Sequence, residues 1–280
     1  MHLFVDNLTN IDFSYLDHQR GLVGETWLAN AALDGALDSQ GMVCDFGVVK
    51  KTLRHWLDDQ LDHRLLVPIR SPHLELKQED GQIALTWLLA DGEQINLSGP
   101  DQAFALVKAE SIDAESVAAW SVRQLASAFP TSVERLRLEF TCEEIPDPYY
   151  HYSHGLKKHG GNCQRIAHGH RSRIQIFLDG ERSSEWERKW AERWRDIYLG
   201  TSEDLLAQTE RTLQFAYWAR QGHFALGIPA ARCELMNCDT TVEQLAQYIA
   251  DTIAAGQPGK EVRVRAYEGL GKGAIASAKA

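Results

Sequence analysis

The sequence predicts an α+β protein built from two related halves. Alternating apolar and polar residues in RSRIQIFLDG (171–180) predict a half-buried strand, and its final Asp-Gly is a hairpin turn signal. In the segment 48–63, Val49, Leu53, Trp56, Leu57 and Leu61 share one face at helical spacing. Strand-like and helix-like segments then recur in the same order, which indicates a duplicated unit.

The duplication is visible at a constant offset of 145 residues. GLVGETWLANAALDG (21–35) and IAHGHRSRIQIFLDG (166–180) share Gly24/Gly169 and a Leu-Asp-Gly ending. SVRQLASAF (121–129) resembles TVEQLAQYI (241–249), and each is followed by a basic alternating stretch that ends in Glu139 or Glu268. Two prolines interrupt the pattern within 143–150, so we predict repeats over 1–145 and 146–280.

Two further helices are expected in the second half. The segment 240–256 opens with a threonine cap and closes at Gly256. The segment 185–199 carries Trp186, Trp190 and Trp194 at i, i+4 and i+8. We interpret this tryptophan stripe as core or interface packing.

The composition argues against several classes of function. The 280 residues are 44% hydrophobic, and the net charge of −10 argues against a broad nucleic-acid-binding surface. No apolar run is as long as a membrane span, the N-terminal residues lack a signal-peptide pattern, and the five cysteines form no C-x-x-C pair. We therefore expect a cytoplasmic protein with no membrane partner.

One segment departs from this acidic character. Residues 149–178 contain no Asp or Glu but five Lys and Arg residues: Lys157, Lys158, Arg165, Arg171 and Arg173. Such a segment predicts a local positive potential suited to an anionic ligand, although a solvated basic face is the alternative.

The same segment holds candidate metal ligands. His168 and His170 are two residues apart on a predicted strand, so both imidazoles project from one face, and Gly169 leaves room on the other. His154 is separated from them by a length that suits a neighbouring antiparallel strand. Three histidines with an open fourth position are typical of a catalytic zinc site, and surface histidines are the alternative.

Cys163 lies between these histidines, in the glycine-rich loop GGNCQR. Neighbouring cationic groups favour the thiolate form. The sequence leaves three roles open for this thiol: a fourth ligand, a general base or an unreactive side chain.

These motifs together resemble one family. H-x13-H-x-H with C-x4-H-G-H, the segment GMVCDFGVVKKTLRHWLDDQLDHRLLVP (41–68), TTVEQLAQYI (240–249) and YEG (267–269) are similar to the 6-pyruvoyltetrahydropterin synthase and 6-carboxytetrahydropterin synthase family. The resemblance implies tandem tunnelling-fold (T-fold) repeats. Each would be an antiparallel four-stranded sheet with helices on one face, in a homo-oligomer that closes a barrel.

The family's motifs are divided between the two halves. The first half has Asp62 and His63, but Val23 and Glu25 stand where the histidine pair belongs. The second half has the histidines and Cys163 but no Leu-Asp-His. In this family the site lies at a subunit interface, so the resemblance implies one complete site for every two repeats.

The resemblance also implies roles. It makes His154, His168 and His170 the ligands of Zn²⁺, Cys163 an acid/base thiol, and His63 with Asp62 the complementary acid/base. Glu268, or Glu139 in the first half, would bind the pterin ring. Further substrate-binding candidates are Thr240 and Thr241 for the ring, and Lys157, Lys158 and Arg171 for a triphosphate.

The reaction expected from the resemblance is a zinc-dependent lyase reaction. It converts 7,8-dihydroneopterin triphosphate to 6-carboxy-5,6,7,8-tetrahydropterin, on the queuosine (7-deazaguanine) route, with loss of triphosphate and a two-carbon aldehyde. Formation of 6-pyruvoyltetrahydropterin is the first alternative. A catalytically silent pterin- or zinc-binding homologue is the second.

Overall fold

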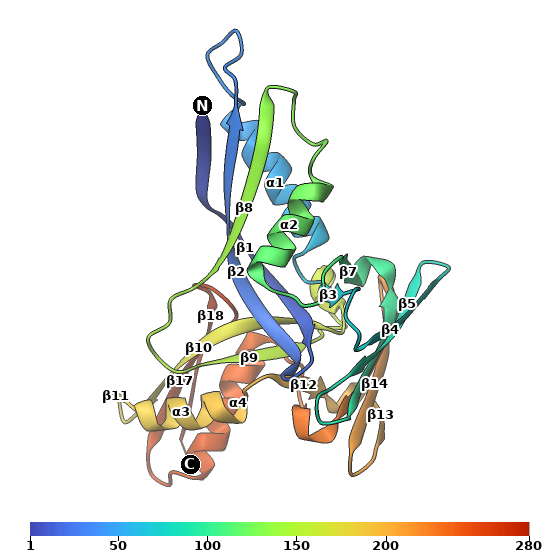
Figure 1. The fold of residues 1–280 in the computed structure, drawn as a ribbon. Helices are drawn as coiled ribbons and strands as arrows, with labels where there is room; N and C mark the ends of the chain where they lie inside the picture. Colours follow the sequence, from blue (N-terminus) through green and yellow to red (C-terminus); the bar gives the residue numbers. More distant parts are fainter. Residues whose placement is uncertain (280) are drawn as a thin grey trace.

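The structure is a computed structural model that describes residues 1–279. One order of elements occurs twice along the chain (Figure 1). The first copy consists of β1 (His2–Asp17), β2 (Gly21–Gly35), α1 (Phe46–Gln60), β3 (Leu65–Pro68), β4 (Leu74–Glu79), β5 (Gln82–Leu88), β6 (Gln94–Pro100), β7 (Phe104–Val107), α2 (Ala114–Gln124) and β8 (Val133–Cys142).

The second copy repeats this order and adds two strands. It consists of β9 (Tyr149–His154), β10 (His168–Leu178), β11 (Glu181–Arg182), α3 (Ser184–Arg193), β12 (Ile197–Thr201), β13 (Leu205–Gln208), β14 (Thr212–Ala219), β15 (Gly222–Pro229), β16 (Cys233–Met236), α4 (Val242–Ala255), β17 (Glu261–Tyr267) and β18 (Gly273–Lys279). Short 3-10 turns connect several strands, and the turn Asn162–Gln164 contains Cys163.

Each copy has its own sheet and core. The first sheet has the strand order β7-β3-β1-β2-β8. Val49, Leu53 and Leu57 of α1 and Val117 of α2 are buried in its core. The second sheet has the order β16-β12-β9-β10-β17-β18, with β11 paired to β10, and α3 and α4 contribute to its core. Helices therefore cover one face of each sheet, as predicted.

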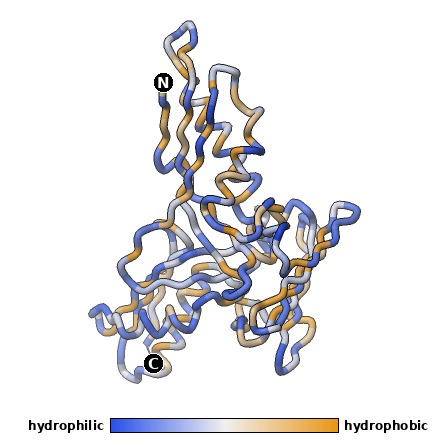
Figure 2. The backbone as a smooth tube through the Cα atoms, viewed as in Figure 1, coloured by the Kyte–Doolittle hydropathy of each residue, from blue (hydrophilic) through white to orange (hydrophobic). Residues whose placement is uncertain are grey.

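A third sheet joins the two copies. Its order is β13-β14-β15-β6-β5-β4, so each copy contributes three strands, and Leu97 of β6 pairs with Leu226 of β15 at the junction. Buried apolar residues alternate with more exposed residues along β5, β14 and β15. Figure 2 shows hydrophobic and hydrophilic segments mixed along this part of the chain. The apolar residues of both copies form one shared core, because the alternation gives each strand one apolar face.

The sheets differ in detail from the expected four antiparallel strands. Strands β9, β10, β17 and β18 are antiparallel neighbours, but the first copy has only β1, β2 and β8 in that arrangement. Short parallel strands extend both sheets, β3 and β7 beside β1, and β12 and β16 beside β9. These additions flank the hairpins of the third sheet, which the periodicity did not reveal.

Two helix predictions also need correction. Thr241 caps α4 and the helix ends at Gly256, as expected, but α3 ends at Arg193 rather than continuing to 199. There Asp196 adopts a left-handed backbone (φ 53°), and the chain enters β12. The helix α2 spans Ala114–Gln124, so the resemblance of 121–129 to α4 is not a structural equivalence.

The two copies meet where β1 and β2 cross β9 and β10 (Figure 1). Ser14 and Ser153 share a 2.7 Å hydrogen bond there. A Cβ on Gly169 would lie 2.7 Å from the Cα of Gly24 and 2.3 Å from the carbonyl oxygen of Tyr152. Only glycine fits at this crossing. Within 1–279, no helix combines the length and apolar character that a membrane crossing requires.

Candidate active site at the junction of the repeats

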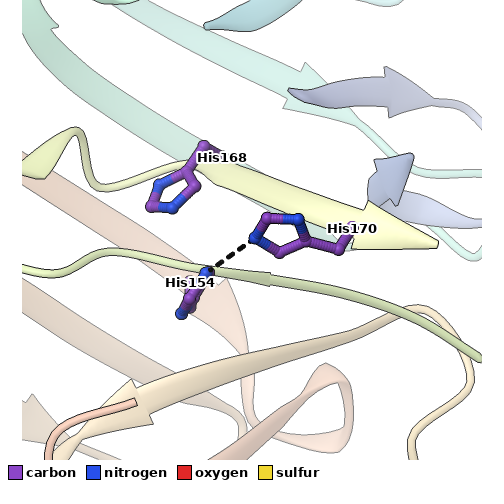
Figure 3. Close-up of side chains that lie close together, drawn as sticks. All are labelled: His154, His168 and His170. Atoms are coloured by element: carbon purple, nitrogen blue, oxygen red, sulfur yellow. Dashed lines mark hydrogen bonds between the residues drawn. The ribbon is translucent and has the colours of Figure 1, made fainter. Parts of the chain in front are cut away.

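Three histidines converge at this crossing (Figure 3). His154 ends β9 and His168 begins β10, and these two residues pair directly across the strands. His170 follows two residues later on the same face, as the strand period requires. One nitrogen from each ring lies within 4.8 Å of the others, and the Nε2 atoms of His154 and His170 are 3.3 Å apart. All three side chains are buried.

The opposite nitrogen of each ring faces a different group. Nδ1 of His154 lies 3.0 Å from the carbonyl oxygen of Thr240 and 3.1 Å from its hydroxyl. Nδ1 of His168 lies 3.0 Å from the carbonyl oxygen of Arg165. Such contacts fix the tautomer that leaves Nε2 free to bind a metal.

The protonation of the rings also suits a metal. Burial and the neighbouring imidazoles hold the pKa of His154 and of His168 well below the usual value, so both rings are neutral. Neutral imidazoles are the form that binds a cation. The three histidines therefore fit a divalent metal bound through Nε2 atoms, with zinc the ion that three histidines commonly bind.

The acid–imidazole pair of the first repeat faces these histidines. His63 follows the end of α1 in a left-handed backbone (φ 56°), and its ring centroid lies 4.9 Å from that of His168. His63 Nδ1 contacts Asp62 Oδ2 at 2.5 Å. Burial alone would lower the pKa of His63, but its contacts with Asp62 and Cys163 raise the pKa to about 10.

Cys163 thus lies beside His63, the residue predicted to be its acid/base counterpart. The thiol is half-buried, and the backbone of its loop is held by the Leu156 N–H, which donates to the Cys163 carbonyl at 2.9 Å. Arg165 from the same loop donates to the carbonyl oxygen of His63 at 3.3 Å, which ties the loop to the first repeat.

Glu268 is near the histidines. Its Oε1 lies 3.9 Å from Nε2 of His170, and its Oε2 lies 3.7 Å from Nζ of Lys272. Glu268 is partly exposed, so its carboxylate is accessible to a ligand beside the histidines.

Glu139 does not occupy an equivalent place. Five residues after Gly169, Ile174 pairs with Ala266; five residues after Gly24, Ala29 pairs with Phe140. Glu268 lies two residues after Ala266, and Cys142 lies two residues after Phe140. The first-repeat counterpart of Glu268 is therefore Cys142 rather than Glu139. Glu139 instead borders a surface groove of about 980 Å³ between α2 and β8, which none of the three histidines lines.

The remaining candidates have protein partners. Thr241 caps α4, and Thr240 is buried against His154. Lys157 pairs with Glu203 and Asp204, and Lys158 pairs with Glu203 and Asp239.

Arg171 stacks on Tyr149, 4.2 Å from the ring centre. It also donates to the carbonyl oxygen of Glu143 at 2.6 Å. Phosphate binding by Arg171 or by either lysine would therefore compete with an existing contact.

The matching position in the first repeat has no histidine cluster. Because Ser14 pairs with Gly24 as Ser153 pairs with Gly169, Tyr15 corresponds to His154, and Val23 and Glu25 correspond to His168 and His170. Arg20 binds Asp196 across this position with contacts of 2.6 and 3.0 Å. An internal ion pair thus occupies the place of a second site.

Asp12, a buried residue of β1 beside His170, was not predicted from the sequence. Its segment, IDFSYLD, has no motif, but Asp12 is a charged residue within an apolar strand, and that was the available signal.

Fold and site define a tandem α+β protein whose buried three-histidine centre is completed by an acid–imidazole pair from its other repeat. The family model described as 6-pyruvoyl tetrahydropterin synthase matches residues 11–152 and again residues 147–279. The chain belongs to this family.

Solved structures of the same description are similar in fold to half of the chain. The 6-pyruvoyl tetrahydropterin synthase of Plasmodium vivax is 19% identical, with a TM-score of 0.42, and the match covers 50% of this chain and 90% of that one. The Plasmodium falciparum protein is 16% identical, with a TM-score of 0.41 and the same coverage. No curated protein matches the chain.

Proposed function

We propose that this protein is a zinc-dependent lyase that converts 7,8-dihydroneopterin triphosphate to 6-carboxy-5,6,7,8-tetrahydropterin. Members of its family are lyases that act on a dihydropterin triphosphate. The observation that carries the proposal is the position of His63 of the first repeat, 4.9 Å ring to ring from His168 of the second. One chain thereby supplies both groups of residues that the reaction needs.

His154, His168 and His170 would hold the zinc ion. When bound, zinc supplies Lewis-acid stabilisation of negative charge that develops on the oxygens of the substrate side chain. The burial of all three histidines excludes water from their side of the ion.

Cys163 and His63 would transfer the protons. The thiolate of Cys163 would remove a proton beside the pterin ring, and the thiol formed in this way would return a proton to the product. His63 is on the opposite repeat and holds its proton firmly, because Asp62 contacts Nδ1 at 2.5 Å. It would therefore act as the acid that protonates a departing oxygen or carbon.

Glu268 would orient the substrate. A carboxylate can accept two parallel hydrogen bonds from the amino-pyrimidine edge of a pterin, and Glu268 lies beside His170 with one face exposed. Contacts of the triphosphate with Lys157, Lys158 and Arg171, and of the ring with Thr240 or Thr241, stay predictions. A homo-oligomer is also proposed, because the outer edges of β8 and β18 pair with no strand within residues 1–279.

The test is product analysis with purified, zinc-loaded protein. The protein is incubated with 7,8-dihydroneopterin triphosphate, and products are identified by mass spectrometry. We expect a 6-carboxy product with acetaldehyde. Cys163→Ala and His63→Ala should each lower kcat by roughly 10²-fold or more with zinc retained. His168→Ala should lose the metal.

Matched controls are Cys44→Ala, His55→Ala and His159→Ala, which change residues of the same types outside the site. A pyruvoyl product would establish the alternative reaction. Bound zinc without any turnover would identify a silent homologue. Full activity of Cys163→Ala would remove the thiol from the mechanism.

A further inference from the structure

Asp12 is a buried carboxylate from one repeat that contacts a candidate metal ligand of the other. Asp12 is 2% exposed. It lies on β1 of the first repeat, whereas His170 lies on β10 of the second. Nδ1 of His170 is buried and has no aligned hydrogen-bond partner within residues 1–279. Asp12 Oδ1 lies 3.2 Å from this nitrogen.

The carboxylate is held in place by other groups. The Thr26 hydroxyl donates to Oδ1 at 2.6 Å, and Lys272 Nζ lies 3.3 Å from Oδ2. A Cβ on Gly269 would lie 2.4 Å from Oδ1, so the chain of the second repeat closes over the carboxylate. An ionised group this buried needs such partners to offset desolvation.

The backbone of the same residue holds the acid–imidazole pair. The Asp12 N–H donates to Oδ1 of Asp62 at 2.8 Å, and the Asp12 carbonyl accepts the His63 N–H at 2.6 Å. This last bond holds the backbone of His63, which is left-handed shortly after the end of α1. Residue 12 thus contacts both halves of the candidate site.

The matching position across the junction places an acid near an imidazole with the residue types exchanged, although these two groups lie farther apart and Nδ1 of the imidazole there lies 2.7 Å from the carbonyl oxygen of Gly24. His151 corresponds to Asp12, and its Nδ1 lies 3.8 Å from Oε2 of Glu25, the counterpart of His170. Each repeat therefore reaches across the crossing with one member of a carboxylate–imidazole pair. An acid thus lies near an imidazole on both sides of the junction. At the histidine centre the acid comes from the first repeat.

We propose that Asp12 is a positioning residue that orients His170 through its carboxylate and Asp62–His63 through its backbone, and so aligns the two halves of the site. The metal-binding part of this inference rests on the proposed function. A carboxylate on Nδ1 makes Nε2 a stronger ligand and fixes the ring plane. Asp12 itself touches neither metal nor substrate.

The test compares the zinc affinity of the full-length protein with that of Asp12→Asn, measured by competition with a chromophoric chelator. The expected loss is roughly 10–100-fold, the range found when a group that supports a ligand is removed. Asp12→Glu should restore part of the affinity. Asp6→Asn, on the same strand but exposed, is the matched control and should bind zinc normally.

A second readout separates positioning from folding. Cobalt(II) is substituted for zinc, and its visible absorption, which reports ligand geometry and strength, should shift in Asp12→Asn but not in Asp6→Asn. The melting temperatures of the metal-free proteins show whether Asp12→Asn folds. If it does not fold, Asp12→Glu, which keeps the charge but moves it, supplies the same comparison.

The outcomes distinguish this inference from the proposed function. Wild-type zinc affinity and an unchanged cobalt spectrum in folded Asp12→Asn would overturn the role of Asp12 and leave the lyase proposal standing. A wild-type protein that binds zinc but has no lyase activity would overturn the lyase proposal alone. A wild-type protein that binds no zinc would overturn both.

Discussion

Two carboxylates at the crossing of the repeats, Asp12 and Glu25, differ in protonation because their neighbours differ. Burial raises the pKa of an acid, but His170 and Lys272 hold the pKa of Asp12 below its usual range. Glu25 is similarly buried, and that burial raises its pKa to about 7. Beside it, burial lowers the pKa of His151 to about 4. Between about pH 4 and pH 7 this second pair is therefore mostly uncharged.

This difference predicts how Glu25→Gln changes stability with pH. In the folded protein Glu25 keeps a proton up to about pH 7, whereas its usual pKa is 4.5, so its contribution to stability falls as pH rises between these values. Glutamine does not ionise, so the Glu25→Gln variant does not lose stability in this way as the pH rises. Relative to wild type, Glu25→Gln should gain on the order of 1–3 kcal/mol between pH 4.5 and 7.

Urea unfolding at pH 5 and pH 8 measures the effect. The contribution of His151 to stability has the opposite pH dependence, because it increases as the pH rises from about 4 to 6.5. His151 is present in both proteins, so this effect is common to their curves. Glu79→Gln, at an exposed position of β4, is the control and should follow the wild-type curve. Parallel pH curves for wild type and Glu25→Gln would show that Glu25 ionises normally.

At the scale of elements, the crossing of β2 and β10 sets the geometry of the site. Gly169 separates the two ligands of β10 and faces Gly24 of β2, so the strands approach to backbone contact. That approach brings the end of α1, and with it His63, against the histidines of the second repeat. The small residue is thus part of the site without offering any chemical group.

Gly169→Ala should therefore damage both stability and metal binding. The new methyl group would meet the backbone oxygen of Tyr152 at 2.3 Å, and that atom cannot move without displacing β9. We expect a loss of about 2–3 kcal/mol or more in unfolding free energy, together with weaker zinc binding. Chemical denaturation and chelator competition measure the two effects.

Gly227→Ala provides the comparison within a strand. Its nearest neighbour would be the Asn96 side chain at 3.7 Å, an ordinary contact, so stability should change little. Equal tolerance of both substitutions would mean that the strands can separate without consequence, contrary to the close crossing.

At the scale of the whole molecule, ion pairs and a shared sheet hold the two repeats together. β6 and β15 join the third sheet, and Arg20 of the first repeat binds Asp196 of the second. Arg20 also donates to the hydroxyl of Tyr15 at 2.9 Å. This network fills the position where a second histidine centre would otherwise lie, which accounts for a single candidate site in residues 1–279.

A double-mutant cycle with Arg20→Met and Asp196→Asn should detect this link. Asparagine tolerates the left-handed backbone of residue 196, so the cycle isolates the ion pair. The Asp196 side chain is 13% exposed, and we expect a coupling energy of about 1–2 kcal/mol by urea unfolding.

The exposed pair Lys189–Glu185 on α3 is the control, with an expected coupling of about 0.5 kcal/mol or less. A coupling between Arg20 and Asp196 that is no larger than this would show that the pair does not hold the repeats together.

The sequence by itself determined the features that depend on local spacing. The period of two along β10 put His168 and His170 on one face, and the caps at Thr241 and Gly256 defined α4. The family and the tandem T-fold were predicted from motifs and are confirmed. The end of α3 was misplaced, because the buried Trp194 continues the helical spacing one residue past Arg193, where the helix ends and the chain then turns at Asp196.

Only the tertiary structure decided the contacts between distant segments. Glu139 was matched with Glu268 by the similarity of two short strands, but strand register makes Cys142 the counterpart. The six-stranded sheet and the place of Asp12 beside His170 were not visible in the sequence. These features depend on packing between residues far apart in the chain, and neither periodicity nor capping carries that information.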